Sequence, residues 1–183
     1  MSGIFWGFFF VFLNFNLNLN GHTINLLPAF VGYWMLARSM DALSGESELF
    51  GALRPFAIGM AVYTAILWVG DVLAITSSGP VSMLLGLLAT LVSLYVAWGV
   101  SRAVEDMERA HGADLGAAGV RGAWIALAVG EALALLANAV AMLGLGAVVL
   151  GILGLVVALV GIVWFLVALW GTKKRFEALS PEK

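Results

Sequence analysis

The sequence predicts an all-α integral membrane protein with four full transmembrane helices after an irregular N-terminal unit. Of its 183 residues, 62% are hydrophobic and only 11% are charged, whereas about a quarter of the residues in soluble domains are charged. The mean hydropathy is +1.03. The stretch 55–101 holds a single charge, Asp71, and the stretch 122–172 holds only Glu131. A soluble fold of this length could not cover so much apolar surface, but a bilayer-spanning helix needs about 20 such residues.

Four spans follow from these apolar blocks, and we expect helices over 55–75, 81–101, 121–143 and 147–171. Pro55 suits the first turn of a helix, where its missing N–H would be unpaired in any case. Residues 44–53 are expected to be a short connector before it. We expect 102–120 to be a cytoplasmic extension of the second helix followed by a loop, with His111-Gly112 ending the helix. The pair Glu105 and Arg109 has the i,i+4 spacing that supports such an extension.

The basic residues orient these spans, because cytoplasmic loops collect Lys and Arg. With four spans, all nine fall on one side: Arg38, Arg54, Arg102, Arg109, Arg121, Lys173, Lys174, Arg175 and Lys183. We therefore expect one transmembrane domain over 1–183, with both termini in the cytoplasm. No basic segment or small-residue cleavage site precedes the first apolar run, so we expect no removable signal peptide and a chain that begins at or near Met1.

Residues 1–43 form an irregular first unit. The apolar run 3–13 is too short to cross a bilayer, and residues 14–20 alternate strictly between asparagine and an apolar residue. This period of two predicts a β-strand, and Asn20-Gly21 is a favoured type I′ hairpin turn. Centring the turn there pairs polar with polar and apolar with apolar residues: Asn18 with Thr23, Leu17 with Ile24, Asn16 with Asn25, and Phe15 with Leu26. A slip of one residue would destroy this match.

A second short helix is expected from Pro28 to Asp41, so that the unit is a half-helix, a β-hairpin and another half-helix. Ten helical residues rise about 15 Å, which is half of the ~30 Å hydrocarbon core. The hairpin would cover the outer half, enclosed by the other helices or by water, because an open strand edge cannot face lipid. The alternative is two short spans joined by an external loop. Both interpretations keep Arg38 and the N-terminus inside.

Asp71 and Glu131 are the first candidates for a ligand or ion pocket, because they are the only acids inside the predicted spans. Such charges cost at least ~2.5–3.5 kcal/mol on insertion scales and usually face the bundle interior. Asp71 lies 17 residues beyond Arg54, which places it about 25 Å from the cytoplasmic boundary. Asn138 lies equally far beyond Arg121. Glu131 falls near the midplane.

These residues share helix faces with other small or polar residues. On the third span, Glu131, Ala134, Asn138 and Ala141 recur at helical spacing, and on the first span Thr64 shares the face of Asp71. We expect the asparagine-bearing face of the hairpin to meet Asp71 and Asn138 in an outward-opening polar pocket, with Glu131 beneath as a proton or cation site. The alternative is a structural network in which these groups satisfy one another. The hairpin candidates are Asn14, Asn16, Asn18, Thr23 and Asn25.

No signature of catalysis, a metal site or a cofactor stands out. There is no cysteine, the two histidines are isolated, and no Gly-rich loop follows a strand to hold phosphate. We expect no nucleic-acid partner. The expected partners are the lipid bilayer, an unidentified small molecule or ion, and a second copy or another membrane protein. Small residues that permit close helix approach are Gly3, Gly7, Gly144, Ala147, Gly151, Gly154, Ala158 and Gly161.

The run Leu27-Pro28-Ala29-Phe30-Val31-Gly32-Tyr33 resembles a motif of uncharacterised small bacterial multi-span membrane proteins, in which Leu-Pro-x-Phe-x-Gly-Tyr follows an irregular first segment. The resemblance covers about the first quarter of the chain and implies a bacterial plasma (inner) membrane protein. Those relatives often carry an acidic residue where this chain has Ala29, so a polar role at that position is absent here. The resemblance implies no particular activity.

We therefore expect a small membrane transporter, or the substrate-binding membrane subunit of one, because broken elements that meet inside a membrane often build substrate sites. The alternative is a non-catalytic interaction or scaffold protein that binds partners through its small-residue faces and whose polar residues are structural. A membrane enzyme comes third, because no nucleophile–base pair or metal cluster can be assembled. The ligand, the direction of transport and the oligomeric state stay open.

Overall fold

The computed structural model describes residues 1–12, 16–19, 22–25, 28–73, 80–142 and 147–179. Its elements are α1 (Ser2–Phe12), β1 (Asn16–Leu19), β2 (His22–Asn25), α2 (Ala29–Ala42), α3 (Glu48–Val72), α4 (Pro80–His111), α5 (Ala117–Met142) and α6 (Val148–Leu179). Within the described part, α3 to α6 are the helices long and apolar enough to cross a bilayer. The chain is thus a multi-pass membrane protein with the four predicted spans.

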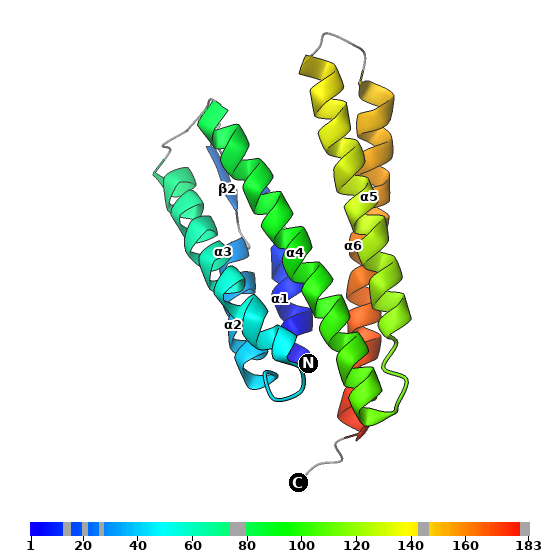
Figure 1. The fold of residues 1–183 in the computed structure, drawn as a ribbon. Helices are drawn as coiled ribbons and strands as arrows, with labels where there is room; N and C mark the ends of the chain where they lie inside the picture. Colours follow the sequence, from blue (N-terminus) through cyan, green and yellow to red (C-terminus); the bar gives the residue numbers. More distant parts are fainter. Residues whose placement is uncertain (13–15, 20–21, 26–27, 74–79, 143–146, 180–183) are drawn as a thin grey trace.

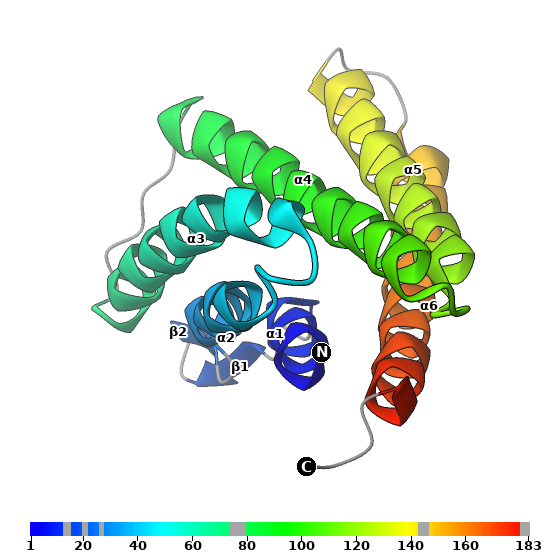
Figure 2. The same cartoon turned by 60° about the horizontal axis from the view of Figure 1, so that its bottom comes forward.

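The four spanning helices form two antiparallel pairs that diverge (Figure 1). Helices α3 and α4 make one pair, α5 and α6 make the other, and α4 packs against α5 to join them. Helix α2 packs on α3, and α1 packs on both α2 and α6. Figure 2 shows that α1 and α2 lie in the angle between α3 and α6. The two short helices therefore close one side of the bundle.

The positive charge gathers at one end of the bundle. There α1 meets the last turns of α6, with the rings of Phe5 and Trp170 4.9 Å apart. We call this end the basic end, because the Lys and Arg residues of the described part lie near the α2–α3 and α4–α5 connections and in the last turns of α6: Arg38, Arg54, Arg102, Arg109, Arg121, Lys173, Lys174 and Arg175. The opposite end, where α3 and α4 separate from α5 and α6, is the open end. The one-sided distribution of basic residues agrees with the sequence prediction.

The buried core lies in the basic half of the molecule. Its largest fully buried side chains are Ile4, Phe8, Leu36, Met40, Phe50, Leu53, Val96, Val100, Val104, Met107, Leu115 and Phe165. Toward the open end the same helices expose apolar side chains, for example Leu84, which is 66% exposed, and Val149, which is 79% exposed. Apolar exposure on this scale suits a surface that faces lipid rather than water.

Helix α3 corrects two predictions about its start. It begins at Glu48, so residues 48–53 belong to the helix rather than to a connector, and Pro55 lies inside it. Two features explain the earlier start. The Ser47 hydroxyl accepts a hydrogen bond from the Leu49 amide at 3.3 Å, and Phe50 and Leu53 are buried. Their burial offsets the cost of an internal proline, which is about 3 kcal/mol.

The extension of α4 follows the prediction. The helix ends at His111, and Gly112 has a φ of +60°, the left-handed conformation that a C-terminal glycine adopts readily. Glu105 and Arg109 pair at 3.6 Å. In the following loop the Glu108 carboxylate accepts hydrogen bonds from the amides of Leu115 and Ala117, and so caps the start of α5. Helix α6 is longer than predicted and continues to Leu179.

The first unit contains two short helices, with 11 residues in α1 and 14 in α2. Between them β1 and β2 pair antiparallel, with Asn16 opposite Asn25, Leu17 opposite Ile24 and Asn18 opposite Thr23. These three pairs are those of the register derived from the sequence. The pair of Phe15 with Leu26 and the turn Asn20-Gly21 lie outside the described residues.

Candidate functional site

A cleft of about 850 Å³ lies between α4 and α5 toward the open end, where the two helix pairs diverge. Its walls are apolar apart from two side chains, Thr90 on α4 and Asn138 on α5. The lining residues are Met83, Leu84, Gly86, Leu87, Thr90, Leu135, Asn138, Ala139 and Ala141. A largely apolar cleft with a few polar groups is the usual form of a small-molecule site.

One stripe of α5 faces α4 along the whole contact. The Trp124 indole N–H donates a hydrogen bond to the Leu94 carbonyl of α4 at 3.0 Å, and Asn138 lines the cleft. Glu131 lies seven residues from each of them, and a spacing of seven returns to nearly the same helix face. Glu131 is therefore on the stripe that faces α4, although it is not one of the residues that line the cleft.

The depth of Glu131 follows from the same hydrogen bond. Helices α4 and α5 are antiparallel, so moving seven residues from Trp124 to Glu131 on α5 corresponds to moving seven residues from Leu94 back to Leu87 on α4. Glu131 therefore lies at about the level of Leu87, which lines the cleft. Glu131 is half-buried. It forms no hydrogen bond or ion pair with any residue that the structure describes. A carboxylate placed this way inside a membrane span marks a functional position by default.

The two polar side chains of the cleft differ in the hydrogen-bond donors and acceptors that remain free for a ligand. The Thr90 hydroxyl donates to the Gly86 carbonyl of its own helix at 3.1 Å, so its oxygen can still accept. The Asn138 side chain is exposed and makes no hydrogen bond within the described part of the chain. Its amide offers both donors and an acceptor. The cleft can thus hold a molecule that is mainly apolar and carries a polar group.

The other predicted pocket residues lie on the α3 side of the bundle. Thr64 lies in α3, where its hydroxyl donates to the Met60 carbonyl at 2.7 Å. Asp71 lies two residues earlier than Leu73, at the end of the same helix. Asn16, Asn18, Thr23 and Asn25 occupy β1 and β2, and β2 packs against α3. Asn14, together with the side chains of Asp71 and of the strands, lies outside the described residues.

The predicted pocket residues therefore fall into two groups in the structure. It places Asn138 in the wall of the α4–α5 cleft and Glu131 on the same stripe of α5, whereas β2 neighbours α3. Ala134, expected on the face of Glu131, turns instead toward α6, because its backbone lies against Gly154. The apolar residues of the α4 wall were not selected by the sequence analysis. Met83, Leu87 and Thr90 recur at i, i+4 and i+7, and this spacing is the signal that could have identified the wall.

No family model, curated protein or solved structure matches this chain. Among the described residues, no group of three or more His, Asp or Glu side chains could hold a metal ion. The functional argument therefore depends on the geometry of the cleft.

Proposed function

We propose that the chain is a small membrane transporter, or the substrate-binding membrane subunit of one, and that it holds its substrate in the α4–α5 cleft. The observation that supports this is the half-buried Glu131 carboxylate, without a partner in the described structure, on the helix stripe that leads into a cleft of about 850 Å³. Retaining an unpaired carboxylate in a membrane span has a cost of a few kcal/mol. Binding of a proton or cation at Glu131 would explain why the carboxylate is retained despite this cost.

The chemistry of the lining suggests an amphipathic substrate. The leucine and alanine side chains of the walls favour an apolar body, and the Asn138 amide can orient one polar group by hydrogen bonding. A cationic group would pair with Glu131, or Glu131 would exchange a proton when the substrate binds. Asp71, Thr64 and the polar hairpin residues would form the approach on the α3 side.

Orientation is part of the proposal. We place the basic end in the cytoplasm, because positive residues are retained on that side, and we place both termini there, in the plasma membrane of a bacterium. The cleft then opens in the outer half of the bilayer, and the hairpin lies at the same depth beside α3.

The alternative, an interaction protein that binds through small-residue faces, has less support. Its candidate surfaces pack within the chain. A Cβ added at Gly154 would lie 2.8 Å from the Ala134 amide nitrogen, and one at Gly161 would lie 2.6 Å from that of Leu127. Gly7 of α1 is likewise packed against Leu36 of α2. The described small-residue faces of α1 and α6 are therefore occupied.

Cysteine labelling tests whether the cleft is hydrated and open to the outside. The chain has no cysteine, so Asn138→Cys provides a single thiol. In right-side-out vesicles it should react with a membrane-impermeant thiol reagent at least about ten times faster than Ile152→Cys, because a thiolate forms only where water reaches. Ile152 is exposed on α6 at a similar depth but does not line the cleft.

Ser44→Cys reports orientation in the same assay. Ser44 is exposed in the loop between α2 and α3 at the basic end, so it should react only after the vesicles are permeabilised. Equal, slow labelling at positions 138 and 152 would show a cleft filled by lipid and would contradict a hydrated substrate site. Labelling of position 44 in intact vesicles would reverse the proposed orientation.

Glu131→Gln tests the proton or cation site. In proteoliposomes that enclose a pH indicator, a panel of amphipathic amines should produce solute-dependent proton movement with the unmodified protein. Glu131→Gln should abolish this movement because an amide neither titrates nor pairs with a cation. Asn138→Ala should weaken the apparent affinity for the solute and leave the coupling to protons intact. Full proton movement by Glu131→Gln would make Glu131 a structural residue.

A further inference from the structure

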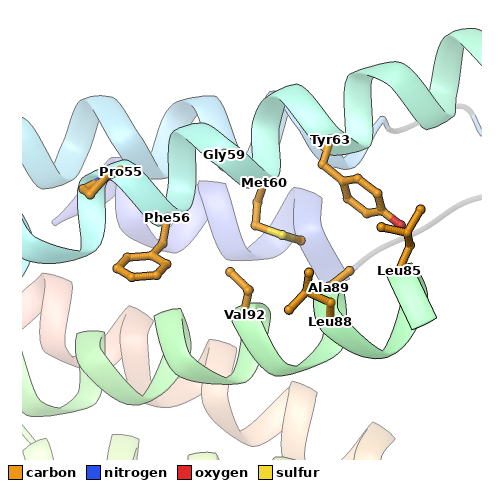
Figure 3. Close-up of a pocket in the computed structure, with 9 residues that line it drawn as sticks. All are labelled: Pro55, Phe56, Gly59, Met60, Tyr63, Leu85, Leu88, Ala89 and Val92. Atoms are coloured by element: carbon orange, nitrogen blue, oxygen red, sulfur yellow. The ribbon is translucent and has the colours of Figure 1, made fainter. Parts of the chain in front are cut away.

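A second groove, distinct from the cleft, lies between α3 and α4 on the outer surface of that pair. Its volume is about 380 Å³. Figure 3 shows Phe56 and Met60 projecting from α3 toward α4, where Leu88 and Val92 lie, and Tyr63 projecting toward Leu85 of α4. The lining is apolar apart from the Tyr63 hydroxyl. Both walls belong to spanning helices, so the groove faces the hydrocarbon of the bilayer.

The groove continues into an aromatic row at its basic end. The ring of Phe56 packs edge-on against Tyr95, with centroids 5.0 Å apart, and Tyr95 stacks on Trp98 at 5.8 Å. Phe56 and Tyr95 are both exposed. Tyr and Trp side chains collect where hydrocarbon gives way to lipid head groups. The row therefore marks the level of the interface along the groove.

A cation completes the row. The Arg102 guanidinium carbon lies 5.9 Å from the centre of the Trp98 ring, within the range of a cation–π contact. Arg102 also donates to Glu105 at 2.8 Å. The Glu105 carboxylate is shared, however, because Arg109 and Arg121 also lie within 3.6 Å of it. Arg109 also pairs with Asp106 at 3.3 Å, so two carboxylates face three guanidinium groups and one positive charge remains. Arg102 uses one of its five N–H donors in its bond to Glu105.

We infer that this surface binds one anionic phospholipid from the leaflet at the basic end. The phosphate pairs with Arg102, the glycerol region lies along Trp98 and Tyr95, and an acyl chain lies in the groove beside Gly59. The dimensions agree, since Arg102 is ten residues from Val92 on α4, or about 15 Å. Basic pockets between transmembrane helices are a known form of lipid head-group recognition. The inference does not depend on the proposed transport function.

Two features favour lipid over other occupants. The groove suits an apolar occupant that reaches it within the bilayer, and the spare N–H donors of Arg102, in a cluster with one excess positive charge, suit an anion on the same molecule. An anionic phospholipid meets both requirements with its chain and its phosphate. A transmembrane helix of a second copy would fill the groove but would bring no acceptor for the remaining N–H donors of Arg102.

Native mass spectrometry of the purified full chain provides the test. The protein is titrated with phosphatidylglycerol or with phosphatidylcholine of identical acyl chains. We expect phosphatidylglycerol to bind about five times more tightly, the factor equivalent to about 1 kcal/mol for one basic residue near an anionic lipid. Arg102→Gln should remove this preference. Gly59→Leu should lower the binding of both lipids, because the new side chain fills a space in which a Cβ has no neighbour within 4 Å.

Matched variants separate this site from general effects of charge and size. Arg109→Gln removes a neighbouring charge that also contacts Glu105 but does not stack on Trp98, and it should keep the preference. Gly171→Leu enlarges another glycine with open space around it and should not affect lipid binding. If Arg102→Gln does not fold, the lipid binding of Gly59→Leu still tests whether an acyl chain occupies the groove.

Three results would overturn the inference. The first is an equal loss of preference in Arg109→Gln and Arg102→Gln. The second is competition by free glycerol phosphate as effective as that by the lipid, which would indicate a site for a soluble anion. The third is a Gly59→Leu variant that binds both lipids normally, or one that changes a dimer into a monomer, which would assign the groove to a second copy.

Discussion

The two spanning helix pairs differ in how closely their helices pack. In α5–α6, glycines bring the backbones together: a Cβ at Gly154 would lie 2.8 Å from the Ala134 nitrogen. In α3–α4, a glycine allows close contact only toward the basic end, where a Cβ at Gly99 would lie 2.5 Å from the Leu53 side chain, and a groove of about 380 Å³ lies between the helices farther along. The glycine of that groove, Gly59, has no neighbour within 4 Å of an added Cβ. Small residues thus close one pair against lipid, whereas the other keeps a space that lipid can enter.

The difference also bears on how each pair is held in place. Without a hydrophobic driving force between helices in a bilayer, association depends on close packing and on hydrogen bonds between helices. The α5–α6 pair has the close packing. The α3–α4 pair has bonds from α4 to its neighbours: the Tyr33 hydroxyl of α2 lies 2.5 Å from the Ser93 hydroxyl, and Trp124 of α5 donates to the Leu94 carbonyl.

A Gly→Ala substitution in each pair should give the largest difference in stability between the two pairs. Gly154→Ala should destabilise the protein by about 1–3 kcal/mol, the usual cost of overpacking, because the new methyl group meets backbone atoms that cannot rotate away. Gly59→Ala should stabilise it by about 0.5–1 kcal/mol, since alanine is the better helix former and the site is open. Reversible unfolding in mixed micelles measures both. Equal effects of the two variants would contradict the difference in packing.

Much of this fold could be predicted, because the bilayer restricts it strongly. The four spans, the end of α4 at His111 and the gathering of basic residues at one end follow from apolar length, from turn residues and from charge. The start of α3 could not be found by the same rules. Pro55 indicated a helix start, whereas the burial of Phe50 and Leu53 decides where the helix begins, and burial is a property of the assembled bundle.

The candidate site was predictable only in part, for the same reason. Spacing alone places Glu131 and Asn138 on one face of α5, and the structure puts that face toward α4. Spacing does not say which helix a face will meet. The small residues of α6 indicated close packing, but whether they meet α5 or a second copy depends on tertiary contacts. The opening of the cleft likewise follows from the divergence of two helix pairs, which no local pattern encodes.

A smaller change in the free energy of unfolding is expected when a hydrogen bond that holds α4 is removed. Tyr33→Phe removes the hydroxyl that bonds Ser93 and should cost about 0.6 kcal/mol, the average for a side-chain hydrogen bond between membrane helices. Tyr63→Phe is the matched control, because the Tyr63 hydroxyl makes no hydrogen bond within the described structure; it should leave the free energy of unfolding unchanged.

Ser93 keeps its bond to the Ala89 carbonyl at 2.8 Å in the Tyr33 variant, so no buried group loses its last partner and the loss stays small. In a double-mutant cycle with Ser93→Ala the coupling energy should equal the cost of Tyr33→Phe. A coupling near zero would show that the bond between Tyr33 and Ser93 does not help to position α4.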